Sequence, residues 1–330
     1  MKSFANRSPA SVSEAIELLG AAQANGQVAY AAGGGSDLLG MVKDELITAP
    51  DTIVDLKRIP DLDQIRNVGR GIEIGALVSI NALGSDEQIQ ARYPVLAEAA
   101  QAVGTPQIRN TGTIAGNICQ RPWCWYFRQG FECLKRGGDR CYSANGENQQ
   151  HAIFGGGPSF IVHPSDTANS LVALDAEFRI SGPNAERAVT AAEFFVLPRD
   201  NLLAENILQA DELLTAIVLP ESRANRRGTY QKIMDRETWN HAVVSLALTL
   251  DMDGEVCREA RLVLGGVAPI PWRVQAAEQM LRGERITAEL AQRAGEAAVA
   301  GAQALAKNGY KITMTQALIR RSILALSGTA

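Results

Sequence analysis

The first two thirds of the chain alternates between short helical and short strand patterns. Residues 11–24 carry apolar side chains at helical spacing, which predicts an amphipathic helix capped by Ser11 or Ser13. Residues 27–32 are a continuous apolar run, which predicts a buried strand that leads directly into a run of glycines. Further strands are predicted at 52–56, 71–76, 159–162 and 177–181, helices at 38–43, 80–90, 94–103 and 166–176, and a polar loop at 104–118.

The pattern changes near residues 222–228. Three predicted strands, at 230–234, 243–250 and 261–266, are followed by three predicted helices, at 272–283, 287–304 and 312–327. Strands followed by helices are typical of an α+β domain with helices on one face of a sheet. We therefore predict a first domain over 1–225 and a C-terminal α+β domain over 226–330, with a three-stranded sheet and helices.

Composition narrows the functional class. The 330 residues suffice for two or three domains, and 46% of them are hydrophobic. A net charge of −4 argues against nucleic-acid binding, which needs a basic surface. No apolar run reaches the length of a membrane span, and no apolar segment follows the N-terminal charges as in a secretory signal. We expect a cytoplasmic protein, or a periplasmic one exported folded with a partner.

Four of the five cysteines lie between residues 119 and 141, with the spacing C-x4-C-x8-C-x7-C. Clustering argues against the scattered disulfides of a secreted fold. Four thiolates can hold an iron–sulfur cluster or zinc, but structural zinc loops usually contain two closely spaced cysteine pairs, and only one is present here. We favour a redox cluster in the loop at about 119–150; zinc, a disulfide or free thiols are the alternatives. The candidate ligands are Cys119, Cys124, Cys133 and Cys141.

Two glycine-containing segments suggest a binding site for a large anion. Gly33, Gly34 and Gly35 follow a predicted strand and precede a short helix, where missing Cβ atoms would let phosphate oxygens reach backbone N–H groups. The run matches neither the Rossmann nor the Walker spacing, and a tight turn is the alternative reading. The loop at 104–118 adds hydrogen-bonding side chains and two glycines. Together the segments suggest one extended dinucleotide, although the second could be an ordinary surface loop.

Five motifs, in this order, resemble the FAD-binding medium subunit of the xanthine dehydrogenase / molybdenum hydroxylase family. They are A-x-G-G-G-S-D-L at 31–38, G-T-x-Q-I-R-N-x-G-T-I-A-G-N at 104–117, H-P-S-D-x-A at 163–168, Y-Q-K-I-M-D-R at 230–236 and L-G-G-V-A at 264–268. The resemblance implies an α+β fold, in which a two-lobed FAD-binding domain of the vanillyl-alcohol-oxidase type precedes a small α+β domain. The similarity covers nearly the whole chain.

The cysteine segment resembles an insert found in two branches of that family. These are the FAD subunit of bacterial aldehyde oxidoreductases, whose pattern is closer, and the β subunit of 4-hydroxybenzoyl-CoA reductase; in both, the insert carries a [4Fe–4S] cluster. Related chains of the aldehyde oxidoreductase branch have a cysteine where this chain has Ser159, and need not have one at Cys119. Since serine is a poor iron ligand and Cys257 lies in the other domain, we take Cys119 as the fourth candidate.

The resemblance also implies roles for single residues. Asp166 would hold a polar edge of the FAD, or cap a helix, and Lys232 would approach the isoalloxazine, or be a solvated strand lysine. The pyrophosphate would lie on Ala32, Gly33, Gly34, Gly35, Ser36, Asp37 and Leu38. Flavin and phosphates would be lined by Thr105, Arg109, Asn110, Gly112, Thr113, Gly116 and Asn117.

The implied function is electron transfer within a molybdenum-containing hydroxylase or dehydrogenase. A large molybdopterin-binding subunit would oxidise an aldehyde or N-heterocycle, a small subunit would carry [2Fe–2S] clusters, and FAD on this chain would pass electrons to an external acceptor. No catalytic group is predicted here, because His151, His163 and His241 form no recognisable triad. The alternatives are a stand-alone flavin oxidoreductase with a structural zinc loop and a non-enzymatic scaffold.

Overall fold

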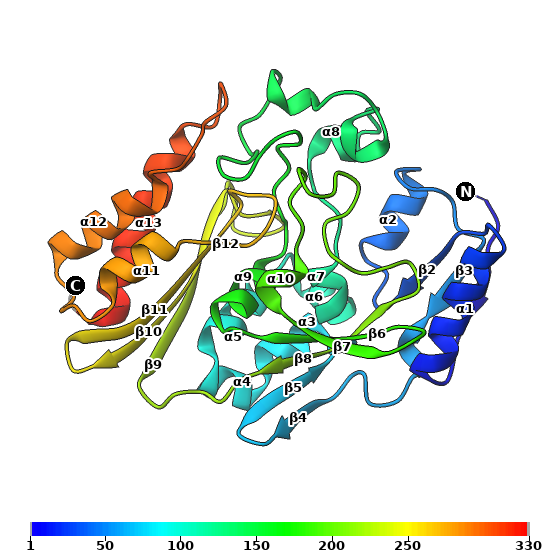
Figure 1. Ribbon diagram of the computed structural model, residues 1–330, viewed down its shortest axis with the longest axis horizontal. Helices are drawn as coiled ribbons and strands as arrows, with labels where there is room; N and C mark the ends of the chain where they lie inside the picture. The colour runs from blue at the N-terminus through cyan, green and yellow to red at the C-terminus, as the bar shows by residue number, and fades with distance from the viewer. Residues whose placement is uncertain (1, 329–330) are drawn as a thin grey trace.

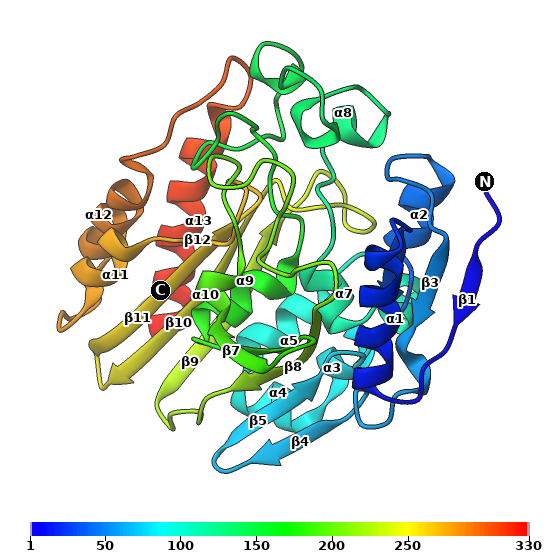
Figure 2. The same cartoon turned by 45° about the vertical axis from the view of Figure 1, so that its right-hand side comes forward.

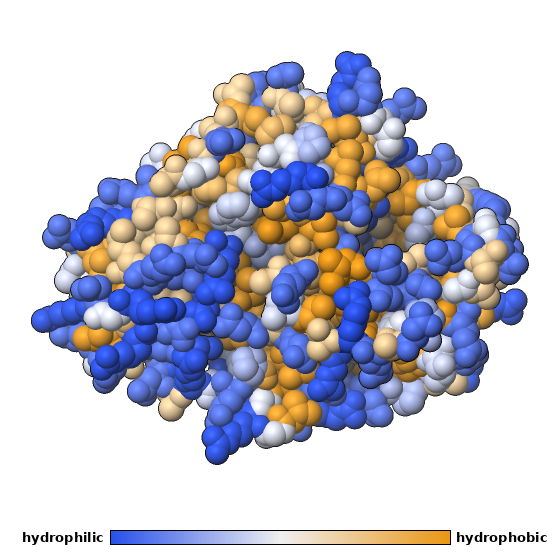
Figure 3. All heavy atoms as spheres, in the orientation of Figure 1, coloured by the Kyte–Doolittle hydropathy of each residue, from blue (hydrophilic) through white to orange (hydrophobic). Residues whose placement is uncertain are grey.

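The computed structural model describes residues 2–328. It contains a three-stranded, a five-stranded and a four-stranded sheet, and helices lie beside each of them (Figure 1). No helix within residues 2–328 has the length and hydropathy needed to cross a membrane. The face in Figure 3 is mixed, with hydrophilic residues dominating at the lower left and apolar residues exposed near the middle.

The N-terminal lobe is a small parallel sheet with order β1-β3-β2, formed by β1 (Ala5–Arg7), β2 (Ala29–Ala32) and β3 (Thr52–Asp55). Helix α1 (Val12–Ala24) begins as predicted at Ser11, whose side chain accepts a hydrogen bond from the Glu14 N–H. Its buried face packs against β3. The glycine run connects β2 to the short helix α2 (Leu38–Lys43) and therefore lies at the end of a parallel strand.

The second lobe is an antiparallel sheet with order β4-β5-β8-β6-β7. Its strands are β4 (Ile65–Val68), β5 (Gly71–Gly75), β6 (Glu177–Ser181), β7 (Glu186–Thr190) and β8 (Leu213–Leu219). Its helices are α3 (Ile80–Ser85), α4 (Glu87–Arg92), α5 (Pro94–Gln101), α6 (Pro106–Thr111), α7 (Ile114–Ile118), α9 (Asp166–Ala173) and α10 (Ala191–Phe194). Sheet and helices share one apolar core, which includes Ile72, Leu96, Leu171 and Phe178.

The cysteine segment lies between α7 and α9 and is mostly irregular. It contains one short helix, α8 (Trp125–Arg128), and two 3-10 turns, Leu134–Arg136 and Tyr142–Ala144. In Figure 1 the segment forms the top of the molecule. It is anchored to the C-terminal domain by Lys311, whose Nζ donates to the carbonyls of His151 at 3.2 Å and Gly266 at 2.7 Å.

The C-terminal domain is an antiparallel sheet with order β12-β11-β10-β9, covered on one face by helices (Figure 2). Its strands are β9 (Arg226–Ile233), β10 (Val244–Asp253), β11 (Val256–Gly265) and β12 (Trp272–Arg273), and its helices are α11 (Gln275–Leu281), α12 (Ala288–Val299) and α13 (Tyr310–Ser327). The predicted sheet lacked only β12, whose two residues are too few to give an alternating pattern.

The C-terminal sheet also packs against the second lobe, because β9 contacts α5 while β10 and β11 contact α9. This contact places the end of β9 beside the start of α9. Residues 66 positions apart in the sequence, Asp166 and Lys232, meet there. The junction between the domains is therefore where the site is built.

Candidate functional site

A cavity of about 690 Å³ lies where the glycine run, the segment 103–121 and the residues after β9 come together. The two glycine-containing segments that the sequence predicts to share one ligand therefore face the same space. The cavity is lined by Tyr30, Ala31, Ala32, Gly33, Gly34, Gly35, Ser36, Asp37, Leu38, Met41, Ile47, Ile80, Val103, Gly104, Ile108, Gly112, Thr113, Gly116, Asn117, Cys119, Gln120, Arg121, Trp123, Pro164, Asp166, Lys232, Arg236, Trp239, Asn240 and His241.

Close backbone contact between the two segments explains the glycines. A Cβ on Gly34 would lie 1.9 Å from the carbonyl oxygen of Thr111, and a Cβ on Gly33 would lie 2.8 Å from Oγ1 of Thr113. Gly35 has φ +72°, which side chains rarely adopt. The run is thus needed for packing the two segments together as well as for exposing N–H groups to the cavity.

The segment 104–118 contains two short helices, where the sequence predicts a loop. Thr105 accepts a hydrogen bond from the Ile108 N–H at 3.4 Å and begins α6, with Pro106 as the first helical residue. Thr113 accepts from the Gly116 N–H at 3.3 Å and begins α7. The capping residues Thr105 and Thr113 stabilise the N-termini of α6 and α7. The segment is therefore helical despite the high glycine and polar content from which a loop was predicted.

The predicted residues of this segment divide into two groups. Gly112, Thr113, Gly116 and Asn117 line the cavity, whereas the sequence-predicted Thr105, Arg109 and Asn110 do not. Arg109 Nη1 instead donates to the Val103 carbonyl at 2.9 Å. Asn117 also supports α9, because its Oδ1 accepts hydrogen bonds from the hydroxyls of Ser165 and Thr167.

Asp37 joins the glycine run to the cysteine segment. Its carboxylate accepts a hydrogen bond from the Arg121 backbone N–H at 3.0 Å and pairs with the Arg128 guanidinium at 2.8 Å. The same guanidinium lies over the Trp123 ring, 4.1 Å from its centroid. Because the negative charge of Asp37 is already paired with Arg128, it repels an anion at the glycine run less than a free carboxylate would.

Asp166 and Lys232 form a buried ion pair on the cavity wall. The Lys232 Nζ donates to the Asp166 carboxylate at 2.7 Å and to the Ala102 carbonyl at 3.0 Å, and only 4% of the Lys232 side chain is exposed. The Tyr230 hydroxyl donates to the other Asp166 oxygen at 2.6 Å. Burial raises the pKa of Asp166 despite the attraction of Lys232. Lys232 is thus not a solvated strand lysine, and the N-cap of α9 is Ser165.

The sequence reasoning missed several residues that close the cavity. Arg121 and Trp123 precede α8, and Arg236, Trp239 and His241 follow β9. Trp239 has φ +52° and is 57% exposed, which is unusual for a large aromatic side chain. The basic and aromatic residues that directly follow the predicted strand 230–234 were the feature of the sequence that could have indicated this part of the cavity.

Three of the four clustered cysteines surround one small internal void. Cys124, Cys133 and Cys141 line it together with Ser159. The void, of about 10 Å³, is about the smallest that can hold one water molecule. The structure does not bring Cys119 to this void: Cys119 ends α7, packs against the core of the second lobe and lines the 690 Å³ cavity.

The polar contacts of the thiols also separate Cys119 from the cysteines at the void. The Cys124 sulfur lies 3.2 Å from His151 Nε2, and the Cys141 sulfur lies 3.1 Å from the Ser143 hydroxyl. Burial raises the pKa of Cys124 to about 11, with further increases from the nearby thiols of Cys133 and Cys141. Burial alone raises the pKa of Cys119 to about 12.

Within residues 2–328, no three His, Cys, Asp or Glu side chains converge closely enough to hold one ion. Tetrahedral zinc, with Zn–S bonds of about 2.3 Å, would need its thiolates about 3.8 Å apart. A cluster spreads its thiolates farther, because each one binds a different iron.

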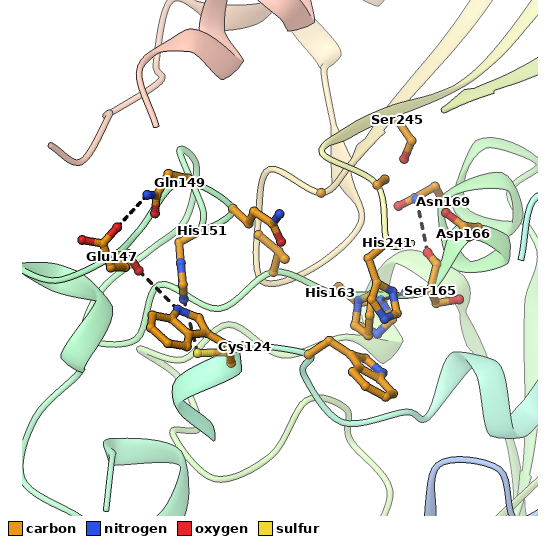
Figure 4. A pocket seen from close by; sticks show the side chains of 17 residues that line it. Cys124, Glu147, Gln149, His151, His163, Ser165, Asp166, Asn169, His241 and Ser245 are labelled. Carbon is orange, nitrogen blue, oxygen red and sulfur yellow. Dashed lines mark hydrogen bonds between the residues drawn. The ribbon is translucent and has the colours of Figure 1, made fainter. Parts of the chain in front are cut away.

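A second cavity, of about 540 Å³, separates the first cavity from the cysteine void. Figure 4 shows Cys124, His151 and Glu147 on one side of it and His163, His241 and Asp166 on the other. Burial lowers the pKa of each of the three histidines to about 4, so all three are neutral at physiological pH.

The comparisons with known families agree with this geometry. The family described as the FAD binding domain in molybdopterin dehydrogenase matches residues 2–222, and the CO dehydrogenase flavoprotein C-terminal domain matches residues 229–326. The cavity suits FAD in size, since sites for ligands of this class have volumes of about 300–1,000 Å³. Its lining includes the glycine run and the ammonium group of Lys232, which is paired with Asp166.

Individual relatives match over most of their length. The chain is 34% identical over 297 residues to the aldehyde oxidoreductase FAD-binding subunit PaoB of Escherichia coli, covering 88% of this chain and 89% of that one. It is 31% identical over 327 residues to the carbon monoxide dehydrogenase medium chain of Hydrogenophaga pseudoflava, covering 98% and 96%. A solved structure of carbon monoxide dehydrogenase from that organism superposes with a TM-score of 0.78 at 29% identity, covering 99% and 98% of the chains.

Proposed function

Since the chain belongs to the FAD-binding family of the molybdopterin dehydrogenases, we propose that it is the FAD-binding electron-transfer subunit of a molybdenum hydroxylase. One observation carries the proposal: the two glycine-containing segments and the buried Asp166–Lys232 pair enclose a single cavity. FAD supplies a junction between one-electron and two-electron transfer.

The chain's own residues bind and orient the flavin. Backbone N–H groups of the glycine run would hold the pyrophosphate, with Ser36 as a further donor. Lys232 would place its positive charge toward the isoalloxazine and stabilise negative charge there, while Asp166 and Tyr230 fix its position. Substrate oxidation would take place on a partner subunit, as the relatives named as medium chains and as an FAD-binding subunit suggest.

We extend the proposal to a [4Fe–4S] cluster in the cysteine segment. Three thiols meet at one void beneath Tyr126 and Phe127, which are buried and would shield a cluster from water. Because the void holds only about 10 Å³, these side chains must move apart when a cluster binds. Cys124, Cys133 and Cys141 contain no pair of closely spaced cysteines of the kind usual at structural zinc. This supports a cluster over zinc, and therefore electron transfer over a stand-alone flavin enzyme with a zinc loop.

The proposed partners are a large molybdopterin-binding subunit, a small [2Fe–2S] subunit and an external electron acceptor. The relatives named as medium chains of carbon monoxide dehydrogenase support such an assembly. We propose the cytoplasm as the compartment, with export of the folded complex as the alternative; cell fractionation distinguishes them.

The test is cofactor analysis of the complex purified with its natural partners. We expect one FAD per chain by absorbance, and iron and sulfide exceeding those of the small subunit by roughly four atoms each. Cys133→Ser should remove this excess and leave most of the FAD, because the two sites use different cavities. A preparation without flavin contradicts the function, and about one zinc per chain with no excess sulfide supports the stand-alone enzyme instead.

A further inference from the structure

Cys119 lies apart from the void that Cys124, Cys133 and Cys141 line. Cys119 is held in place by helix α7, since its backbone N–H donates to the Ala115 carbonyl at 2.9 Å. Its side chain packs against the apolar core of the second lobe and lines the 690 Å³ cavity. Both contacts hold Cys119 on the side of that cavity rather than at the void.

Ser159 reaches the void from a different part of the chain than the three cysteines. It is 2% exposed, and its neighbour Ile161 lines the same void. The segment is anchored by a hydrogen bond from the Ala152 N–H to the Phe160 carbonyl at 3.0 Å. Ser159 therefore completes the wall that Cys124, Cys133 and Cys141 leave open.

Three of the other polar side chains around the void have partners. The Ser143 hydroxyl lies 3.1 Å from the Cys141 sulfur, which suits a hydrogen-bond donor to that sulfur. The buried Lys135 ammonium pairs with Glu205 at 2.7 Å. The Tyr126 hydroxyl accepts a hydrogen bond from the Glu147 N–H at 2.7 Å. Tyr142 also lines the void, but its ring packs against those of Tyr126 and Phe131. Of the lining side chains in the described residues, we therefore favour Ser159 to complete a ligand set.

We propose that the three thiolates hold three irons of the cluster and that Ser159, not Cys119, faces the fourth. This inference rests on the cluster proposed above. Thiolate is the ligand that iron–sulfur clusters favour, and a serine oxygen is a harder and weaker donor to iron. The fourth iron should therefore be labile to oxidants.

Oxidation of such a site has a defined balance. A [4Fe–4S]²⁺ cluster that loses one Fe²⁺ and one electron becomes [3Fe–4S]⁺, and ferricyanide takes up the electron. The product is paramagnetic whereas the starting cluster is not. Loss of the fourth iron is thus measured both as released iron and as a new electron paramagnetic resonance signal.

The experiment compares variants of the whole complex before and after mild ferricyanide treatment. In the unmodified complex we expect release of about one iron per chain and the [3Fe–4S]⁺ signal. Ser159→Cys should retain that iron and show little signal. Ser159→Ala should be isolated with the three-iron signal already present. Cys119→Ser should match the unmodified complex in iron content, whereas Cys133→Ser should lose the cluster.

Two results overturn the inference. One is loss of iron in Cys119→Ser as complete as in Cys133→Ser. The other is that the Ser159 variants respond to ferricyanide as the unmodified complex does. If one of the two variants folds poorly, this result in the other variant is decisive. The absence of any iron beyond that of the small subunit in the unmodified complex would instead remove the proposed cluster, and this inference with it, while flavin absorbance tests the rest of the proposed function separately.

Discussion

The buried ion pair on the cavity wall allows a quantitative test of how the two domains are joined. Asp166→Asn keeps the shape of the side chain but removes the charge that faces Lys232 at 2.7 Å. The exposed fractions of the two side chains are 7% for Asp166 and 4% for Lys232, so water cannot replace the lost partner. An unpaired ammonium would remain in the interface between β9 and α9.

The expected cost follows from the burial of both charges. Removing one partner of a buried pair destabilises proteins by about 3–5 kcal/mol, whereas replacing both with neutral groups is often close to neutral. Here burial raises the pKa of Asp166 more than Lys232 lowers it, so the charge of Asp166 is costly in its own right. Asp166→Asn combined with Lys232→Met should therefore be more stable than either single variant.

Thermal unfolding of the purified chain measures this double-mutant cycle. At about 2 °C per kcal/mol for a chain of this size, each single variant should unfold roughly 6–10 °C below the unmodified protein, and the double variant within a few degrees of it. FAD content, measured in parallel, separates loss of folding from loss of the flavin contact. Additive losses in the double variant, or single losses below about 1 kcal/mol, would refute the reasoning.

Three further predictions follow from single contacts. Gly34→Ala should lower FAD retention and the unfolding temperature, because its Cβ would lie 1.9 Å from a backbone oxygen, whereas Gly40→Ala, with nothing within 4 Å, should keep the flavin; equal retention contradicts this. Burial lowers the pKa of His163 from 6.5 to about 4, so the neutral side chain stabilises the fold fully above pH 6.5, and this stabilisation is lost as the pH falls toward 4. Between pH 7.5 and 5 the free energy of unfolding of His163→Gln should therefore fall by about 2 kcal/mol less than that of the unmodified protein. Equal falls in the two proteins would exclude this role of His163. His151→Phe removes the hydrogen bond that the Nε2–H tautomer donates to the Cys124 sulfur at 3.2 Å, which should lower the reduction potential of the proposed cluster relative to the flavin in a spectroscopic titration, where no shift counts against the contact.

Local patterns in the sequence were enough to predict the elements that depend on neighbouring residues. The start of α1 at Ser11 follows from capping chemistry and apolar spacing, and the C-terminal order of strands and helices follows from a change of period. The resemblance of the motifs to the molybdenum hydroxylase flavoprotein family is confirmed by the family matches and by the superposition.

Features that depend on packing between distant segments were not predictable in this way. Spacing alone groups Cys119 with the other three cysteines, but α7 directs it into the core of the second lobe. The burial of Lys232 depends on the contact between the C-terminal sheet and α5, which no local pattern encodes. The position of Ser159 at the void could not be predicted either, because it depends on the path by which the chain after the cysteines comes back to them.

The Asp37 contacts have a consequence for the order in which the subunit matures. Asp37 belongs to the glycine run, yet its hydrogen bond and ion pair hold Arg121 and Arg128 at the beginning of the cysteine segment. If ordering of the cysteine segment by the proposed cluster favours ordering of the glycine run, thermodynamic linkage requires the effect to be mutual. By whatever factor bound flavin improves binding of the proposed cluster, the cluster would improve flavin binding, and retention of most FAD in Cys133→Ser would mean that this factor is small. If the proposed cluster is present, whichever of the two is inserted first would make the second somewhat easier to insert.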